Sequence, residues 1–222
     1  MNDELTVPMG ITTYAALRDR MREDIIAGVL PTGARLTIAD LVARYQVSQM
    51  PVREALQSLA GEGLITLLQH KGASVVEIGP KFVRNAFEMC EVIEGLLARL
   101  SVAHITRAAL AELEKQHLQI ADEMGRGRIE EAYSLNRQFH RTLYEHADNP
   151  LAFEIYERYS ALMSIMRRTH GVSEQRKKAV IEEHANLIDV IRSGDEIAAE
   201  KTARAHNRGS KEDVLAQIQK PV

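Results

Sequence analysis

Residues 34–63 constrain the fold most, because they read as two short helices joined by a tight turn. Thr37 is positioned to cap the first helix, with Asp40 three residues later as in a capping box. Residues 45–47 provide the turn. Ser48 is positioned to cap the second helix by accepting bonds from its free N–H groups. The segment therefore predicts a helix-turn-helix unit.

The second helix combines an apolar back with a defined end. Pro51 falls in its first turn, where a missing N–H costs little. Gly61 and Gly63 end the helix. Its buried stripe is expected to be Val52, Leu56 and Leu59.

The polar N-terminus of this helix suits entry into the major groove of DNA. Gln49 and Arg53 are four residues apart and so share a face, with Met50 beside them. Gln can bond adenine through two contacts, and Arg can bond guanine in the same way. An ordinary helical hairpin in a protein core has the same spacing, so the pattern alone leaves both interpretations open.

Residues 12–78 resemble the winged-helix domain of the GntR superfamily of bacterial transcription regulators. The matching segments are 26–36, 47–56, 59–64 and 71–75. The family usually has Arg at the place of Gln49 and Thr at the place of Met50, so base recognition is expected to differ here. The resemblance implies a DNA-binding domain over residues 12–78. The sequence before it, residues 1–11, is expected to be a loose arm.

Two predicted strands, 64–68 and 73–77, follow the second helix and form the wing. The turn between them carries His70, Lys71 and Gly72, and a cationic turn can reach phosphate or a minor groove. An exposed hairpin tip often carries such residues without that role. The complete set of candidate DNA-binding residues is Arg35, Arg44, Ser48, Gln49, Met50, Pro51, Arg53, His70, Lys71 and Gly72.

The charge does not mark either half of the chain as a basic module of the usual nucleic-acid kind. Residues 1–78 hold seven Lys and Arg against nine Asp and Glu, a net charge of −2, and residues 79–222 have a net charge of −1. DNA affinity is therefore expected to be modest and sensitive to salt. No run of eighteen apolar residues occurs, so we expect no membrane span. The chain has a single cysteine, so an internal disulfide is not expected. Both features favour a cytoplasmic protein.

The rest of the chain has helical periodicity. After a linker at 79–80, helices are expected near 81–103, 106–124, 128–147, 150–169, 174–193 and 195–217. Short loops between them favour a bundle of about six helices over 81–217. The predicted fold class is mainly α: an N-terminal winged helix-turn-helix with a small β-hairpin wing, and an all-α C-terminal bundle.

Three histidines of the bundle form a candidate metal site. Asn136 and His140 are four residues apart and share a helix face, while His184 and His206 lie on two later helices. Three imidazoles and an amide oxygen could converge on one divalent cation, for which Zn or Ni is suitable. Scattered histidines are also common as core or surface residues.

Residues 81–217 are similar to the FCD ligand-binding domain of the FadR subfamily, through residues 136–140, 149–151, 183–184, 194–195 and His206. Many members bind a divalent metal through one Asp or Asn and three His. The resemblance thus implies Asn136, His140, His184 and His206 as ligands. Asn136 is neutral where Asp is common, which is expected to weaken cation binding.

Cys90 departs from the family in the same domain, because an Arg able to bind an effector carboxylate often stands at its place. A thiol is a weak donor without a fixed charge. Arg99, Arg137 and Arg141 are candidate replacements in an effector site that includes Cys90, although they could equally be surface charges. Cys90 could also be a small buried apolar residue. We therefore expect the metal to carry most of the effector's charge recognition.

Taken together, these features predict a homodimeric transcription repressor that binds a palindromic double-stranded operator. A small organic acid in the helical cavity would shift the placement of the DNA-binding heads. The alternatives are a helical metalloenzyme and an architectural DNA-binding protein without an effector. No convincing general base or nucleophile lies beside the histidines, so catalysis is not expected.

Overall fold

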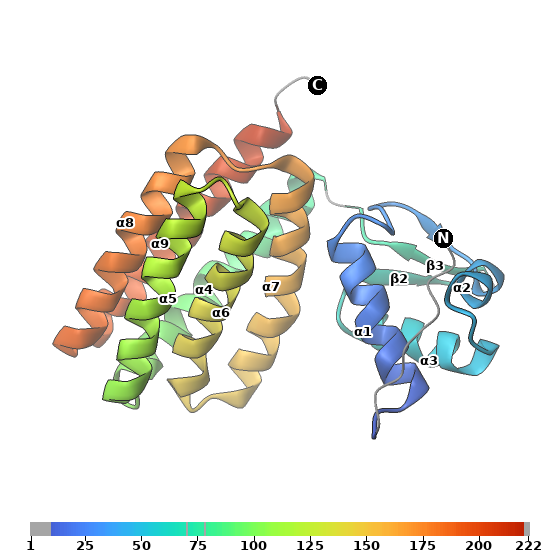
Figure 1. Cartoon of the computed structure of the whole chain (residues 1–222), viewed down its shortest axis with the longest axis horizontal. Coiled ribbons are helices and arrows are strands. Elements are labelled where there is room, and N and C mark those ends of the chain that lie inside the picture. The colour runs from blue at the N-terminus through green and yellow to red at the C-terminus, as the bar shows by residue number, and fades with distance from the viewer. Residues whose placement is uncertain (1–9, 70, 78, 220–222) are drawn as a thin grey trace. The chain divides into compact units, whose positions relative to one another are not determined.

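The computed structural model of the chain describes residues 10–69, 71–77 and 79–219. They form two compact units, divided after Gly79. Residues 1–9 of the expected arm and His70 of the expected wing tip lie outside the described residues. The mainly helical architecture with one small sheet confirms the predicted fold class (Figure 1).

The first unit is built on helices α1 (Thr13–Ile26), α2 (Ile38–Tyr45) and α3 (Gln49–Gly61). The predicted stripe of α3 is buried, and α1 and α3 pack together. Thr37 caps α2, because its hydroxyl oxygen accepts a bond of 3.1 Å from the Asp40 N–H. Ser48 does occupy the N-cap position of α3, but its side chain accepts no capping hydrogen bond. Ser48 is exposed instead, as are Gln49 and Met50 in the first turn of α3.

A three-stranded antiparallel sheet completes this unit, in the order β1-β3-β2. The wing strands β2 (Ile65–Leu68) and β3 (Gly72–Val75) pair as predicted. The short strand β1 (Arg35–Leu36), which sequence analysis did not identify, adds to β3. Gly72 has a φ of +89°, and a Cβ there would lie 2.2 Å from the Leu36 carbonyl oxygen. Glycine is therefore required where β1 meets the wing.

The second unit is a helical bundle, whose helices run alongside one another in Figure 1. Its elements are α4 (Pro80–Val102), α5 (Arg107–Gly125), α6 (Ile129–Tyr144), the 3-10 turn η1 (Glu145–Ala147), α7 (Pro150–His170), α8 (Glu174–Ser193) and α9 (Glu196–Ile218). Every boundary lies within three residues of its predicted position, and Pro80 already belongs to α4. The expected helix 128–147 instead ends at Tyr144 and finishes as η1.

The bundle core explains how the candidate site is positioned. Large apolar side chains from five helices fill it, among them Leu97, Leu113, Phe139, Tyr156 and Ile188. Among the described residues, no helix is both long and apolar enough to cross a membrane. The helices α4 and α9 pack against each other extensively, with α6 and α8 close by. Several polar residues of these helices are buried together with the core, among them Asn136, His140, His184 and His206.

Candidate DNA surface and metal-effector site

The first turn of α3 presents the expected polar surface. Gln49, Met50 and Arg53 are all exposed, and 65% of Met50 is accessible. Pro51 is half-buried beside them. Within the described part of the chain, the Arg53 side chain has no hydrogen bond or ion pair. Its guanidinium N–H groups are therefore available to a partner.

The remaining candidate DNA residues lie around the sheet and α2. Arg35 in β1 and Lys71 beside the wing turn are exposed. Arg44 is already engaged, because its guanidinium lies 3.8 Å from Asp24 and 5.7 Å from the centre of the Tyr45 ring. Arg44 keeps an exposed edge, but its side chain is anchored within the unit.

The three predicted metal-binding histidines meet inside the bundle. His140 on α6, His184 on α8 and His206 on α9 are all buried, and one nitrogen of each lies within 4.8 Å of the others. Each pair of ring centres is 5.0 Å apart. Three helices distant in sequence thus bring three imidazoles to one point.

Of the three histidines in the cluster, His184 has the fewest hydrogen-bond partners for its ring nitrogens. It is fully buried, its ring stacks on Phe139 at 4.3 Å, and neither of its nitrogens has a hydrogen-bond partner among the described residues. The Nδ1 atom of His140 is also buried without a partner. Unpaired buried polar atoms are costly and usually have a functional reason.

The electrostatics keep these rings neutral. Burial lowers the pKa of His140 and His184 well below the ordinary value, and each is lowered further by its imidazole neighbours. Burial also lowers the pKa of His206. A neutral imidazole is the form that binds a metal, so no proton has to leave at neutral pH.

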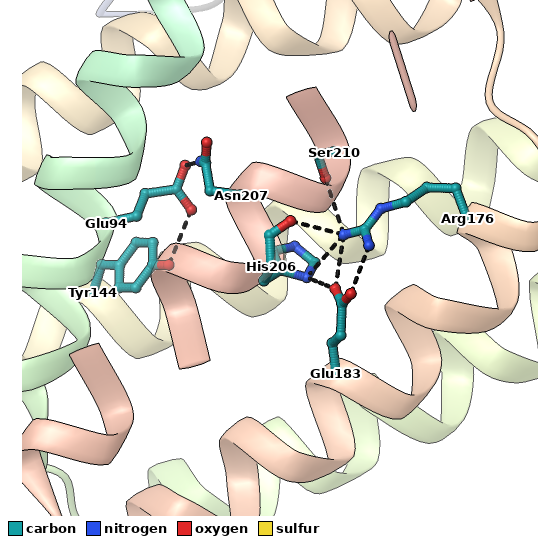
Figure 2. Close-up of polar contacts among 7 residues, drawn as sticks. All are labelled: Glu94, Tyr144, Arg176, Glu183, His206, Asn207 and Ser210. Carbon is teal, nitrogen blue, oxygen red and sulfur yellow. Dashed lines mark hydrogen bonds and ion pairs between the residues drawn. The ribbon is translucent and has the colours of Figure 1, made fainter. Parts of the chain in front are cut away.

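A polar network fixes the orientation of His206 (Figure 2). Its Nδ1 lies 2.6 Å from the Glu183 carboxylate, and Arg176 donates two bonds of 2.6 and 2.7 Å to the same carboxylate. Arg176 also donates to the His206 carbonyl oxygen and to Ser210 Oγ. Burial acts to raise the pKa of Glu183, but its bonds with His206 and Arg176 outweigh this and lower it. A histidine that donates Nδ1–H to a carboxylate presents Nε2 as a metal ligand.

Asn136 is buried one turn before His140 on α6. A hollow beside the imidazole cluster is lined by Asn136 together with His140 and His206. The donor set suits a divalent metal, because three buried imidazoles converge and those of His140 and His184 carry nitrogens without partners among the described residues. Sequence reasoning predicted Asn136 and the three histidines as ligands, but it gave no role to Arg176 or Glu183. Arg176 and Glu183 are seven residues apart, about two helical turns, and so lie on one face of α8, which was the available signal.

A second set of buried polar contacts, drawn in Figure 2, joins Glu94 to Tyr144 and Asn207. Glu94 and Asn207 also line the hollow that Asn136, His140 and His206 share. The Glu94 carboxyl accepts bonds from Tyr144 Oη at 3.0 Å and from Asn207 Nδ2 at 2.8 Å. Burial raises the pKa of Glu94 to about 7, although Tyr144, Arg167 and Asn207 act to lower it. The Oδ1 atom of Asn207 is buried and has no partner among the described residues.

Three of the four predicted effector residues do not line the hollow. Arg99 pairs with Glu200, and Arg141 pairs with Glu145 and Glu157 near the surface. Neither lines the hollow, nor does Cys90, which is buried in α4.

Arg137 is exposed at the rim of the hollow and does line it. A further lining residue, Arg167 on α7, was missed by sequence reasoning. The sequence places it in the last turn of a helix, where basic residues are common for the helix dipole alone.

Comparisons with known proteins agree with both units. The family described as "FCD domain" matches residues 85–209, and the family described as "Bacterial regulatory proteins, gntR family" matches residues 13–75. Both resemblances inferred from sequence motifs are confirmed by these matches.

The relatives are named as regulators. The chain is 27% identical over 194 residues to the HTH-type transcriptional repressor RspR of Escherichia coli (strain K12), covering 87% of this chain and 85% of the relative. It is 25% identical over 197 residues to the probable D-xylose utilization operon transcriptional repressor of Paenarthrobacter nicotinovorans, covering 88% and 85%. The solved structure of E. coli McbR/YncC aligns with a TM-score of 0.80 at 20% identity, covering 93% of this chain and 99% of that one. This last likeness concerns the fold.

Proposed function

The chain belongs to the GntR family of bacterial regulatory proteins and carries an FCD effector domain, and we propose that it is a metal-dependent repressor released from DNA by a small organic acid. It is a DNA-binding transcription regulator rather than an enzyme, as its family and relatives are. The metalloenzyme and architectural alternatives are therefore not favoured.

The DNA contacts we propose are centred on α3. Gln49, Met50 and Arg53 would face base edges in the major groove, and Ser48 and Pro51 would approach the backbone beside them. Arg35, Lys71 and Gly72 would meet phosphates or the minor groove next to the wing. Arg44 would contribute only its exposed edge, since Asp24 and Tyr45 hold its guanidinium. A homodimer would present two such surfaces to a palindromic operator in the cytoplasm.

The metal we propose is a divalent ion, with zinc or nickel as candidates, held by His140, His184, His206 and Asn136. The observation that carries this proposal is the convergence of three buried imidazoles, two of which have nitrogens without partners. When bound, the ion would supply a positive charge and an open position for an anion. Because Asn136 is neutral, that charge would not be offset by a ligand.

The effector would bind beside this cluster, in the hollow that Asn136, His140 and His206 share. An effector regulates only if its affinity differs between the DNA-binding arrangement and another one. Residues from α4, α6, α7 and α9 line the hollow, so a ligand there would touch most of the bundle at once.

The proposal is tested by recovering the operator. Zinc-loaded protein would be used to select binding sites from fragments of its source genome, and the bound sites would be mapped by footprinting. We expect a site with two inverted half-sites, and release of the protein when zinc-binding organic acids are added. Recovery of only unrelated sequences, with equal affinity for each, would contradict sequence-specific regulation.

A further inference from the structure

A metal in the imidazole cluster would still leave one buried atom of His184 without a bond. Both ring nitrogens of His184 are buried, and neither has a hydrogen-bond partner among the described residues. A metal ion binds only one nitrogen of a neutral imidazole, and the other nitrogen then carries the hydrogen. A buried N–H group without an acceptor is costly. His184 therefore needs an acceptor on the side of its ring that faces away from the metal.

His206 already has such an acceptor. Its Nδ1 lies 2.6 Å from the Glu183 carboxylate, which leaves Nε2 for the metal. Histidines that bind metals in proteins almost always have a partner of this kind, because it fixes the ring and its tautomer. Within the part of the chain that the structure describes, no carboxylate is bonded to His184. The acceptor for this ring must come from another kind of residue.

The ring contacts of His184 leave one candidate. Its ring stacks on Phe139 at 4.3 Å, lies 5.0 Å from the rings of His140 and His206, and lies 6.4 Å from the ring of His117 on α5. Phe139 has no hydrogen-bond acceptor, and the other two histidines are proposed ligands themselves. Of these four neighbours, His117 is the one whose ring nitrogens no proposed ligand bond uses.

The chemistry of His117 suits this role. The ring is half-buried and lines a groove between α5 and α8. Its Nδ1 is buried and has no hydrogen-bond partner over residues 10–69, 71–77 and 79–219. With the ring hydrogen on Nε2, Nδ1 is an acceptor. The zinc-bound form of His184 would thus have a donor without an acceptor, beside an acceptor without a donor.

The two rings need only a small movement to bond. A hydrogen bond places two nitrogens about 3 Å apart, which corresponds to about 5 Å between the ring centres. The groove holds about 510 Å³ of empty space, part of it open to solvent, so the His117 ring has room to turn. Glu114 on α5 and Arg192 on α8 line the same groove and pair at 2.7 Å. Because this pair already joins the two helices, we expect the side chain to move rather than either helix.

We propose that His117 is a positioning residue of the metal site, whose Nδ1 accepts a hydrogen bond from the metal-bound His184 ring. The inference rests on the metal proposed above and adds a residue that is not a ligand. It also adds α5, a helix that supplies none of the proposed ligands. Metal binding would then tie α5 to α8 inside the bundle.

The test is competition titration of the full-length protein with zinc against a chelator. His117→Leu fills the space but removes the acceptor, and we expect it to weaken zinc binding by about 10–100-fold. His117→Asn fills the space less well but places an amide oxygen near the position of Nδ1. It should therefore bind zinc within about threefold of the wild type. His104→Leu is the matched control at an exposed histidine, and it should bind zinc as the wild type does.

NMR of the histidine side chains gives a second measurement that packing alone would not change. In the zinc-loaded wild type, the N–H of the His184 ring should exchange slowly with solvent, because it is buried and bonded. The slow signal should be lost in zinc-saturated His117→Leu and kept in zinc-saturated His117→Asn.

Two results would overturn the inference. Wild-type zinc affinity in His117→Leu would mean that His184 needs no acceptor from α5. Equal weakening in His117→Leu and His117→Asn would mean that the ring serves packing. Either result leaves the proposed metal in place, since the wild type would still bind zinc. A wild type that binds no zinc would overturn the proposed metal and this inference together.

Discussion

The most informative single residue is His184, because its burial has no structural compensation. Both ring nitrogens are buried and unpaired among the described residues, and the ring stacks on Phe139. A buried polar group left unsatisfied costs about 1–3 kcal/mol. An apolar side chain would fill the same space without this cost. The imidazole is therefore best explained by a ligand that supplies the missing bonds.

Replacement of His184 by leucine separates these roles. We predict that His184→Leu leaves the metal-free protein as stable as the wild type or more stable, because an unpaired polar group becomes apolar at similar volume. The same variant should lose the rise in melting temperature that zinc gives the wild type. His104→Leu is the control, since that histidine is exposed and outside the cluster. A large loss of metal-free stability with the zinc effect retained would show a packing role.

Glu94 gives a prediction for pH dependence. Its pKa is raised from its ordinary 4.5 to about 7, mainly by burial. A carboxyl whose folded-state pKa is raised contributes its full stability below pH 4.5, and that stability is lost as pH rises through 7. The difference corresponds to about 3 kcal/mol.

Chemical denaturation of the wild type and Glu94→Gln should therefore diverge with pH. With a chelator present, Glu94→Gln is expected to gain stability relative to the wild type between pH 4.5 and 8, because the glutamine does not ionise. Parallel stability curves for the two proteins over this range would be inconsistent with a buried ionisable Glu94.

At the scale of elements, a glycine of α9 leaves room for an arginine side chain of α8. A Cβ at Gly209 would lie 2.6 Å from a terminal nitrogen of Arg176, the residue that pairs with Glu183 beside His206. The absence of a side chain thus makes room for the network that orients one imidazole.

We predict that Gly209→Ala displaces Arg176 and weakens zinc binding by about 10–100-fold, the usual effect of disturbing outer-shell partners. Gly125→Ala is the control in the same bundle, where an added Cβ meets nothing within 4 Å. Competition titrations against a zinc chelator would measure both variants. Unchanged affinity in Gly209→Ala would mean that Arg176 does not position His206.

The recognition helix α3 carries a separate prediction. Arg53→Ala should reduce operator binding by about 1–3 kcal/mol if the side chain makes two bonds to one base. Lys71→Ala should weaken operator and scrambled DNA alike, as loss of a phosphate contact does. Arg107→Ala, an exposed arginine of α5, serves as the control. Gel-shift titrations that give Arg53→Ala the wild-type affinity for operator would remove α3 from base recognition.

On the scale of the whole molecule, periodicity predicted most of the helical architecture, because long amphipathic helices carry their signal locally. The strand β1 was missed because it is two residues long and exists only through pairing with β3. The helix expected over 128–147 breaks into η1, for which we have no sequence signal. Such features are decided by tertiary contacts.

The candidate site likewise combines residues that the sequence predicted with residues that only the tertiary structure brings together. The imidazoles were predicted from a resemblance and from spacing, and the structure brings His140, His184 and His206 together. Arg167, Glu94 and Asn207 were not predicted, because each resembles an ordinary helical residue until three helices enclose it. Charge patterns on single helices cannot distinguish a half-buried arginine that lines a hollow from one in solvent.

Zinc titration of the chelator-stripped, full-length protein would show whether the helical bundle is built around a metal ion. We predict one zinc ion bound per chain, and none in the variant that combines His140→Ala, His184→Ala and His206→Ala. The ion should bind without extensive proton release at pH 7, since the pKa values of all three rings are lowered. If the wild-type protein binds no zinc and no divalent metal raises its melting temperature, the imidazole cluster is not a metal site.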